Sequence, residues 1–124
     1  MNKTTPKQIT QLENSALWQL SKQLALKVRE TVKTVPYQDY YTFSSNVVQS
    51  AVSLTSDIAL IEGKSSDATL FDYHYARGHL FTAKGLLLMA EELKLIEDTA
   101  DVMRDIAKLE QLIEQKIAEL KKVE

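Results

Sequence analysis

Cysteine is absent from the 124 residues of this chain. The chain therefore has no disulfide framework and no thiolate metal site, which fits a protein of a reducing compartment. No apolar run approaches the roughly 18 residues that a membrane-spanning helix needs, and residues 1–10 lack the apolar segment of a secretory signal. These absences predict a soluble, cytoplasmic protein that does not enter a membrane.

Neither basic nor acidic residues predominate, because the formal net charge is only -2. This value argues against strong generic binding of polyanions. The two ends of the chain nevertheless differ: residues 1–34 contain six basic and two acidic residues, whereas residues 96–124 contain eight acidic and five basic ones. We expect the first and last helices to lie side by side with complementary surfaces, where each exposed ion pair contributes little.

Proline and glycine are scarce, with two and three residues, and no stretch alternates apolar and polar residues as a strand does. Instead, apolar residues recur every three or four positions in four long stretches, which is typical of helices with one buried side. The sequence predicts an all-α fold, an antiparallel up-down four-helix bundle over residues 13–124. A flexible N-terminal arm at residues 1–12, which contains Pro6, precedes it.

Capping residues and helix breakers set the expected ends of the first two helices. The first helix begins at Asn14 or Ser15, either of which can cap it. It ends at Pro36, because the proline ring disfavours a helical residue before it. The second helix covers residues 40–62, with Gly63 as its C-cap.

The same signals delimit the third and fourth helices. Ser66 or Asp67 starts the third helix, at residues 68–95, and Asp98 or Thr99 caps the fourth. The expected core stripes are Leu17, Leu20, Leu24, Val28 and Thr31 in the first helix; Phe43, Val47, Ala51, Leu54, Ile58 and Ile61 in the second; Phe71, Tyr75, Gly78, Thr82, Leu86, Met89 and Leu93 in the third; and Val102, Ile106, Leu109, Ile113, Ile117 and Leu120 in the fourth.

More apolar residues are present than one stripe per helix requires. The second and third helices each carry a further apolar line, and large apolar patches left in water usually mark a partner surface. The pattern predicts self-association; the alternative is that a tight bundle buries a wide arc of its middle helices. The expected oligomer interface comprises Trp18, Leu26, Val48, Val52, Ala59, Phe81 and Leu88.

Two glycines lie one heptad apart inside the third helix, at Gly78 and Gly85. Each destabilises a helix by up to ~1 kcal/mol relative to alanine. We expect the close approach of a neighbouring helix to offset this loss, and a ligand seated against bare backbone is the alternative.

The sequence does not bring potential catalytic or metal-binding residues together at one site. His74 and His79, the two histidines, are five residues apart on one helix and point in different directions, so they do not share a metal ion. No serine is positioned to complete a nucleophilic triad. We therefore predict no catalytic residue, no metal site, no cofactor and no enzymatic activity. The carboxylates of the last helix are expected to form a solvated face: Asp98, Asp101, Asp105 and Glu110.

An aromatic cluster occupies the connector between the first two helices. Tyrosine combines apolar bulk with a polar tip and is common at interfaces. We expect this connector to pack over the end of the bundle, and base stacking is the alternative. The cluster consists of Tyr37, Tyr40, Tyr41 and Phe43.

A basic stripe on the first helix is the best indication of nucleic-acid contact. Lys22, Arg29 and Lys33 have the spacing that places them on one outward side. Aligned cations supply salt-dependent phosphate affinity without reading a base sequence. The other interpretation is an ordinary solvated face.

Several runs resemble a known family of small proteins in their order and spacing. These runs are residues 16–28, 31–36, 46–59 and 76–80, followed by Leu87 and residues 90–93. The chain resembles the four-helix bundle family of 23S rRNA intervening-sequence proteins, also called S23 ribosomal proteins. It also resembles the related accessory variability determinant proteins of diversity-generating retroelements. The resemblance covers about residues 12–120.

The resemblance to this bacterial family implies an up-down four-helix bundle assembled as a ring-like homopentamer. It also implies, for the retroelement relatives, binding to nucleic acid and to a reverse transcriptase. Where the family commonly has two arginines, this chain has Val48 and Gln49. We therefore expect a non-enzymatic homo-oligomeric interaction or scaffold protein, with five copies as the family-based number. The alternative is a nucleic-acid-associated accessory protein that contacts the RNA or DNA backbone through its first helix.

Overall fold

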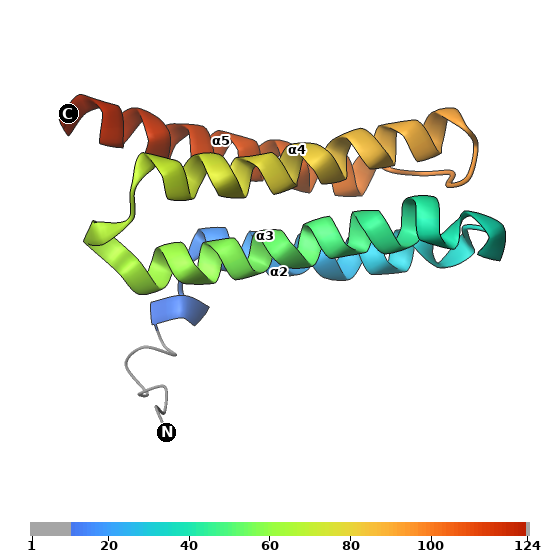
Figure 1. Cartoon of the computed structure of the whole chain (residues 1–124), viewed down its shortest axis with the longest axis horizontal. Helices are drawn as coiled ribbons and strands as arrows, with labels where there is room; N and C mark the ends of the chain where they lie inside the picture. The colour runs from blue at the N-terminus through green and yellow to red at the C-terminus, as the bar shows by residue number, and fades with distance from the viewer. Residues whose placement is uncertain (1–10, 124) are drawn as a thin grey trace, which may run out of the picture.

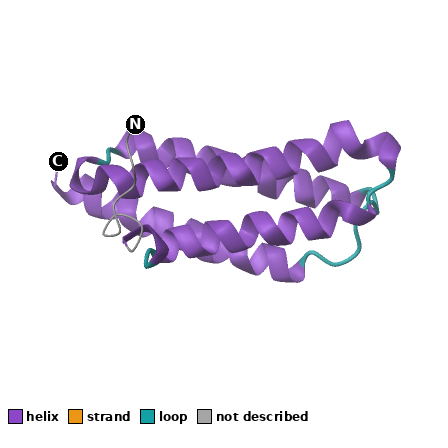
Figure 2. Cartoon of the chain, turned by 90° about the horizontal axis from the view of Figure 1, so that it is seen from below, coloured by secondary structure: helices purple, strands orange, loops and turns teal. Residues whose placement is uncertain are grey.

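The computed structural model describes residues 11–123, and these residues are all-α, with no strand among them. Their four long helices are α2 (Ala16–Thr31), α3 (Ser45–Lys64), α4 (Leu70–Glu92) and α5 (Ala100–Val123). Figures 1 and 2 show these helices running along one common axis, with the chain turning back after each of them. The all-α prediction is confirmed. Of the predicted N-terminal arm, residues 1–10 lie outside the described residues.

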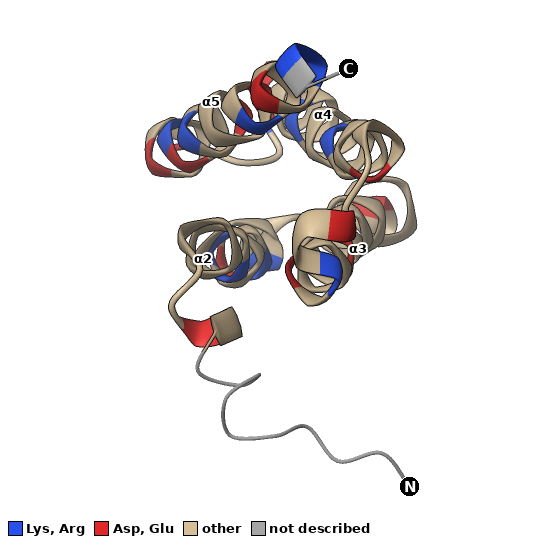
Figure 3. Ribbon diagram, turned by 90° about the vertical axis from the view of Figure 1, so that its left-hand side faces the viewer, with Lys and Arg blue, Asp and Glu red and all other residues tan. Residues whose placement is uncertain are grey.

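Each long helix packs against two of the others. The end view in Figure 3 shows α2 beside α3, with α5 next to α2 and α4 next to α3. All four contribute to one apolar core, because each presents buried aliphatic side chains to the space between them. The largest fully buried apolar side chains are Leu24, Val28, Val47, Leu54, Ile58, Leu80, Leu87, Ile106, Leu109 and Ile113.

Helix α2 begins where the sequence predicts and ends earlier. The Ser15 side chain caps it, because its Oγ accepts a hydrogen bond from the backbone N–H of Trp18 at 3.1 Å. The helix ends at Thr31 rather than at Pro36, since Val32–Thr34 tighten into a 3₁₀ turn. Of its predicted core stripe, Leu17, Leu24 and Val28 are buried, and Leu20 and Thr31 are partly buried.

Helix α3 follows a π-helical turn at Tyr40–Ser44. Its predicted stripe is confirmed: Val47, Ala51, Leu54, Ile58 and Ile61 are buried, and Phe43 packs partly against the core. The predicted C-cap at Gly63 is wrong. Gly63 lies inside the helix, and the left-handed residue that ends α3 is Ser65, with φ 52°.

Helix α4 starts later than predicted. The cap is Thr69, not Ser66 or Asp67, which belong to a 3₁₀ turn. Thr69 Oγ1 accepts a hydrogen bond from the Asp72 N–H at 3.2 Å, and the Thr69 N–H donates to Asp72 Oδ2 at 2.9 Å. This reciprocal capping box satisfies two backbone donors that a helix start otherwise leaves free.

The predicted core stripe of α4 is on the wrong side of the helix. Its members Phe71, Tyr75, Gly78, Thr82, Met89 and Leu93 are exposed, and Leu86 is partly buried. The buried side is instead formed by Tyr73, Ala76, Leu80, Ala83, Leu87 and Ala90. Apolar residues surround most of α4, so spacing alone does not select a side. Packing selects the side whose alanines let α3 and α5 approach closely.

Helix α5 has the predicted core side, with Val102, Ile106, Leu109, Ile113 and Ile117 buried and Leu120 partly buried. Asp98 supports its start, because its Oδ1 accepts a hydrogen bond from the Ala100 N–H at 3.0 Å. Among residues 11–123, no helix has both the length and the apolar character that crossing a membrane requires.

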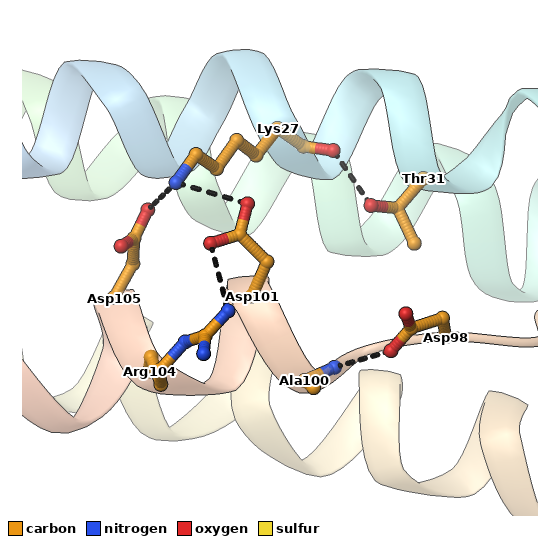
Figure 4. A network of polar contacts seen from close by, with 7 residues as sticks. All are labelled: Lys27, Thr31, Asp98, Ala100, Asp101, Arg104 and Asp105. Atoms are coloured by element: carbon orange, nitrogen blue, oxygen red, sulfur yellow. Dashed lines mark hydrogen bonds and ion pairs between the residues drawn. The ribbon is translucent and has the colours of Figure 1, made fainter.

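The first and last long helices lie side by side, as their opposite charges predict. Lys27 Nζ of α2 lies 3.2 Å from Asp101 Oδ2 and 2.9 Å from Asp105 Oδ2 of α5 (Figure 4). Asp105 is only 4% exposed. The expectation of a solvated carboxylate face is therefore wrong for this residue, and Glu110 is also paired, with Lys84 at 2.9 Å.

Candidate interaction surface

The outer side of α4 and its C-cap carry six of the twelve large apolar side chains that the described residues expose. We define these six as the α4 face: Phe71, Tyr75, Phe81, Leu88, Met89 and Leu93. Phe71 is 72% exposed and Tyr75 is 55% exposed. Large side chains of this kind are usually covered by a partner when they are contiguous.

Aromatic rings are already ordered against each other at one end of the α4 face. The rings of Phe71 and Tyr75 stack with centroids 6.0 Å apart, and the His79 ring meets Tyr75 edge-on at 5.0 Å. Leu60 of α3 is exposed beside them, and it shares a hollow of about 160 Å³ with both aromatic residues. A partner side chain inserted here would meet rings held in place.

The other edge of the α4 face borders α5. The Arg77 guanidinium lies 5.7 Å from the centroid of the Phe81 ring, and its Nη1 lies 2.6 Å from Glu114 Oε1 of α5. Gly78 and Gly85 lie between the two edges, and a Cβ atom built at either one meets nothing within 4 Å. The predicted close approach of a helix to these glycines is therefore not made by any part of residues 11–123.

The predicted oligomer interface does not form one patch. Phe81 and Leu88 belong to the α4 face, whereas Leu26 of α2 is exposed beside Asp98 and Asp101 of the α5 side. Val48 and Val52 line a groove between α2 and α3. Trp18 and Ala59 are partly buried.

The groove between the end of α2 and the start of α3 has a volume of about 980 Å³. We call it the α2–α3 groove. It brings together two cations of the predicted basic stripe, Arg29 and Lys33, with Tyr37 and Tyr40 of the connector. Sequence reasoning noted both groups and did not join them. Their meeting depends on the 3₁₀ and π-helical turns, which leave little pattern in the sequence.

The tyrosine connector packs over the end of the bundle only in part: its Tyr40–Ser44 turn contacts α3 and α4, while its tyrosines stay exposed. Tyr37 is 81% exposed, and Tyr41 is also exposed; only Phe43 packs against the core. Neighbouring rings contact each other instead, with Tyr37 stacked on Tyr40 at 6.5 Å and Tyr41 edge-on to Tyr40 at 5.1 Å. The connector thus presents aromatic rings to solvent.

The basic stripe is exposed along its length. Lys22 and Arg29 are exposed, and Lys33 Nζ, in the 3₁₀ turn after α2, lies 2.9 Å from Glu30 Oε1 of α2. That pair reduces the positive charge that Lys33 offers to a partner. Of these three cations, Arg29 and Lys33 line the groove.

The histidines have separate partners. Nδ1 of His74 lies 2.7 Å from Nη2 of Arg77, and Nδ1 of His79 lies 2.5 Å from Asp57 Oδ2 on α3. Within residues 11–123, no three side chains of the histidine or carboxylate type are grouped as a metal site needs. The His79–Asp57 contact therefore links α4 to α3, and the His74–Arg77 contact links two successive turns of α4.

The side chains with shifted pKa values lie at contacts between helices or at a helix start. Hydrogen bonds to Asp105 and then Asp101 raise the pKa of Lys27, and the Lys27 ammonium lowers the pKa of Asp101. The Thr69 N–H lowers the pKa of Asp72, which burial partly opposes. Burial raises the pKa of the Tyr73 hydroxyl. These groups hold helices together and do not gather around a cleft.

No protein-family model and no curated protein matches this chain. The resemblance to the S23 ribosomal proteins therefore stays a prediction.

Proposed function

We propose that this chain is an up-down four-helix bundle that acts as a non-enzymatic, self-associating scaffold. Two features support the bundle: each long helix packs against two others, and the chain turns back after each one (Figure 1). In this proposal, the function of the protein is to associate with other copies of itself. The number of five copies comes only from the family resemblance.

The α4 face is the observation that carries the proposal. Its six side chains are each about half exposed or more, and large aromatic side chains offer roughly 150–250 Å² each. Together with Leu60 they present an apolar area on the order of 700 Å². A standard protein interface buries about 800 Å² per partner, so this face is large enough for a stable contact.

The face also lacks charge at its centre. Gly78 and Gly85 leave its middle flat and open, and the charged side chains Arg77 and Lys84 lie at its edge, paired with Glu114 and Glu110 of α5. Glu92 is exposed one helical turn after Leu88, so a second copy that covers the face leaves this carboxylate at the solvated border, because burying an unpaired charge is costly. A partner identical to this chain is the simplest occupant that the proposal requires.

Charge substitution on the α4 face tests the proposal. We expect the double variant Phe71→Glu, Met89→Glu to have the mass of a single chain by light scattering, while the native chain has a multiple of it. Burying two carboxylates against apolar surface opposes association strongly. Both residues are exposed, so the helical circular dichroism spectrum should not change.

The matched control places the same charges on α5. Ala107 and Ala118 are exposed on that helix, and the variant Ala107→Glu, Ala118→Glu should keep the native mass. A native mass in the Phe71, Met89 variant would reject the α4 face as the contact surface.

Nucleic-acid association through Lys22, Arg29 and Lys33 stays a prediction and is not part of this proposal. An anisotropy titration at about 50 mM salt, where phosphate contacts are strong, tests it directly.

A further inference from the structure

We propose that the α2–α3 groove binds a small amphipathic organic anion, with a carboxylate or phosphate head and an apolar body. This site lies apart from the α4 face and does not depend on the proposed self-association. Its volume of about 980 Å³ is at the upper end of the usual range of small-molecule sites, about 300–1,000 Å³.

The floor of the groove is apolar. Four valines from both sides of the connector line it: Val32, Val35, Val48 and Val52. Val52 is exposed, and Val35 and Val48 are partly buried. An aliphatic or aromatic body placed on these side chains would remove their apolar surface from water, which is worth about 25 cal/mol per Å².

Positive charge is confined to one part of the lining. Arg29 lies on α2 and Lys33 in the 3₁₀ turn that follows it, and no aspartate or glutamate among residues 11–123 lines the groove. Arg29 forms no ion pair with any residue in the described part of the chain, whereas Lys33 pairs with Glu30. A guanidinium without a carboxylate partner is well suited to hold a carboxylate or a phosphate by two parallel hydrogen bonds.

The stacked rings of Tyr37 and Tyr40 also line the groove, and both residues are exposed. Exposed tyrosines present an apolar face together with a hydroxyl group. They therefore suit the boundary between a buried body and a solvated head.

The same features argue for a small ligand rather than a nucleic-acid strand. Strand binding needs a track of cations along several phosphates, and among residues 11–123 two cations line this groove. A valine floor adds nothing to phosphate binding and much to the binding of an apolar body.

Calorimetric titration of the full chain with decanoate and with decyl phosphate tests the proposal. We expect at least one of the two to bind with one site per chain; the tighter one identifies the head group. Neutral 1-decanol and inorganic phosphate should each bind far more weakly, because each lacks one half of the ligand. Equal affinity for decanol would overturn the proposal, since the cations would then contribute nothing.

Variants locate the site. Arg29→Gln with Lys33→Gln should weaken anion binding by about tenfold or more, as expected for loss of charge-assisted hydrogen bonds. Lys22→Gln, on the same helix but outside the groove, should leave the affinity unchanged. The Phe71→Glu, Met89→Glu variant should also still bind, because the α4 face is a different surface.

Two results contradict the assignment. One is unchanged decanoate and decyl phosphate binding in the Arg29, Lys33 variant. The other is binding of a single-stranded oligonucleotide, lost in that variant, with no binding of either decyl anion; this would assign the groove to nucleic acid.

Discussion

The ion pairs of Lys27 show that the burial of a partner determines how much an ion pair contributes to stability. Lys27 contacts two carboxylates of α5, but Asp101 is largely exposed and Asp105 is buried. Asp105 Oδ2 is buried, and Lys27 Nζ at 2.9 Å is the polar group that the structure places against it. A buried carboxylate left without a partner destabilises a fold far more than an exposed one does.

We therefore expect Lys27→Met to lower the urea midpoint of unfolding more than Asp101→Asn does. The lysine variant leaves Asp105 unpaired, whereas the asparagine variant removes only an exposed partner. The control is Lys116→Met, because Lys116 is an exposed residue 3.8 Å from Glu119. Equal midpoints for the Lys27 and Lys116 variants would show that the Asp105 pair is not stabilising.

The capping box of α4 makes stability depend on pH in the acidic range. The pKa of Asp72 in the folded chain lies below its ordinary value of 3.8. The unfolded chain therefore binds more protons as the pH falls, so acidification favours unfolding. The stabilising contribution of Asp72 is complete above that ordinary value and is lost as the pH falls through the lower, folded pKa.

Urea unfolding measured between about pH 5 and pH 2 checks this dependence. The free energy of unfolding should fall less steeply in Asp72→Asn than in the native chain. Asp67→Asn, at an exposed carboxylate outside the capping box, should have the native slope. A native slope in the Asp72 variant would contradict the assigned role.

For single helices, the sequence predicts the buried side of α5 correctly and that of α4 wrongly, because the two helices differ in how their apolar residues are distributed. In α5 a single apolar stripe faces a polar side, so spacing identifies Ile106, Leu109 and Ile113 as core. In α4 large apolar residues lie on both sides, and three of the six buried residues are alanines. Hydrophobicity ranks Phe71 above Ala76, but close packing between helices favours the smaller residue.

Alanine substitutions distinguish the two sides of α4. Leu87→Ala should lower the free energy of unfolding by about 2–5 kcal/mol, because Leu87 is 1% exposed and its loss leaves a cavity. Met89→Ala should change it by less than about 0.5 kcal/mol, as at other surface sites. Both are best measured in the Phe71→Glu background, where association contributes least; a larger loss for Met89 would reverse the assignment of the two sides.

The candidate surfaces were predicted only in part, again for physical reasons. Phe81 and Leu88 were identified because they lie off the expected stripe, and the structure exposes both. Phe71 and Tyr75 were missed because they were assigned to the core. The α2–α3 groove combines residues of a helix with residues of a connector. Helical spacing predicts which residues share one side of a helix, but not which connector residues lie beside them.

At the scale of the whole molecule, apolar surface is distributed unevenly. The core is filled by all four helices, yet α4 presents more large apolar side chains to solvent than it buries. Residues 11–123 contain no further long helix that could cover them. We infer that other copies do so, and the scaffold proposal depends on this inference.

Sedimentation equilibrium of the native chain over a range of micromolar concentrations measures whether copies associate. We expect a mass that is a multiple of the single-chain mass and that falls toward it only on dilution. A single-chain mass at every concentration would contradict this expectation, because the α4 face would then be stable in water without a partner.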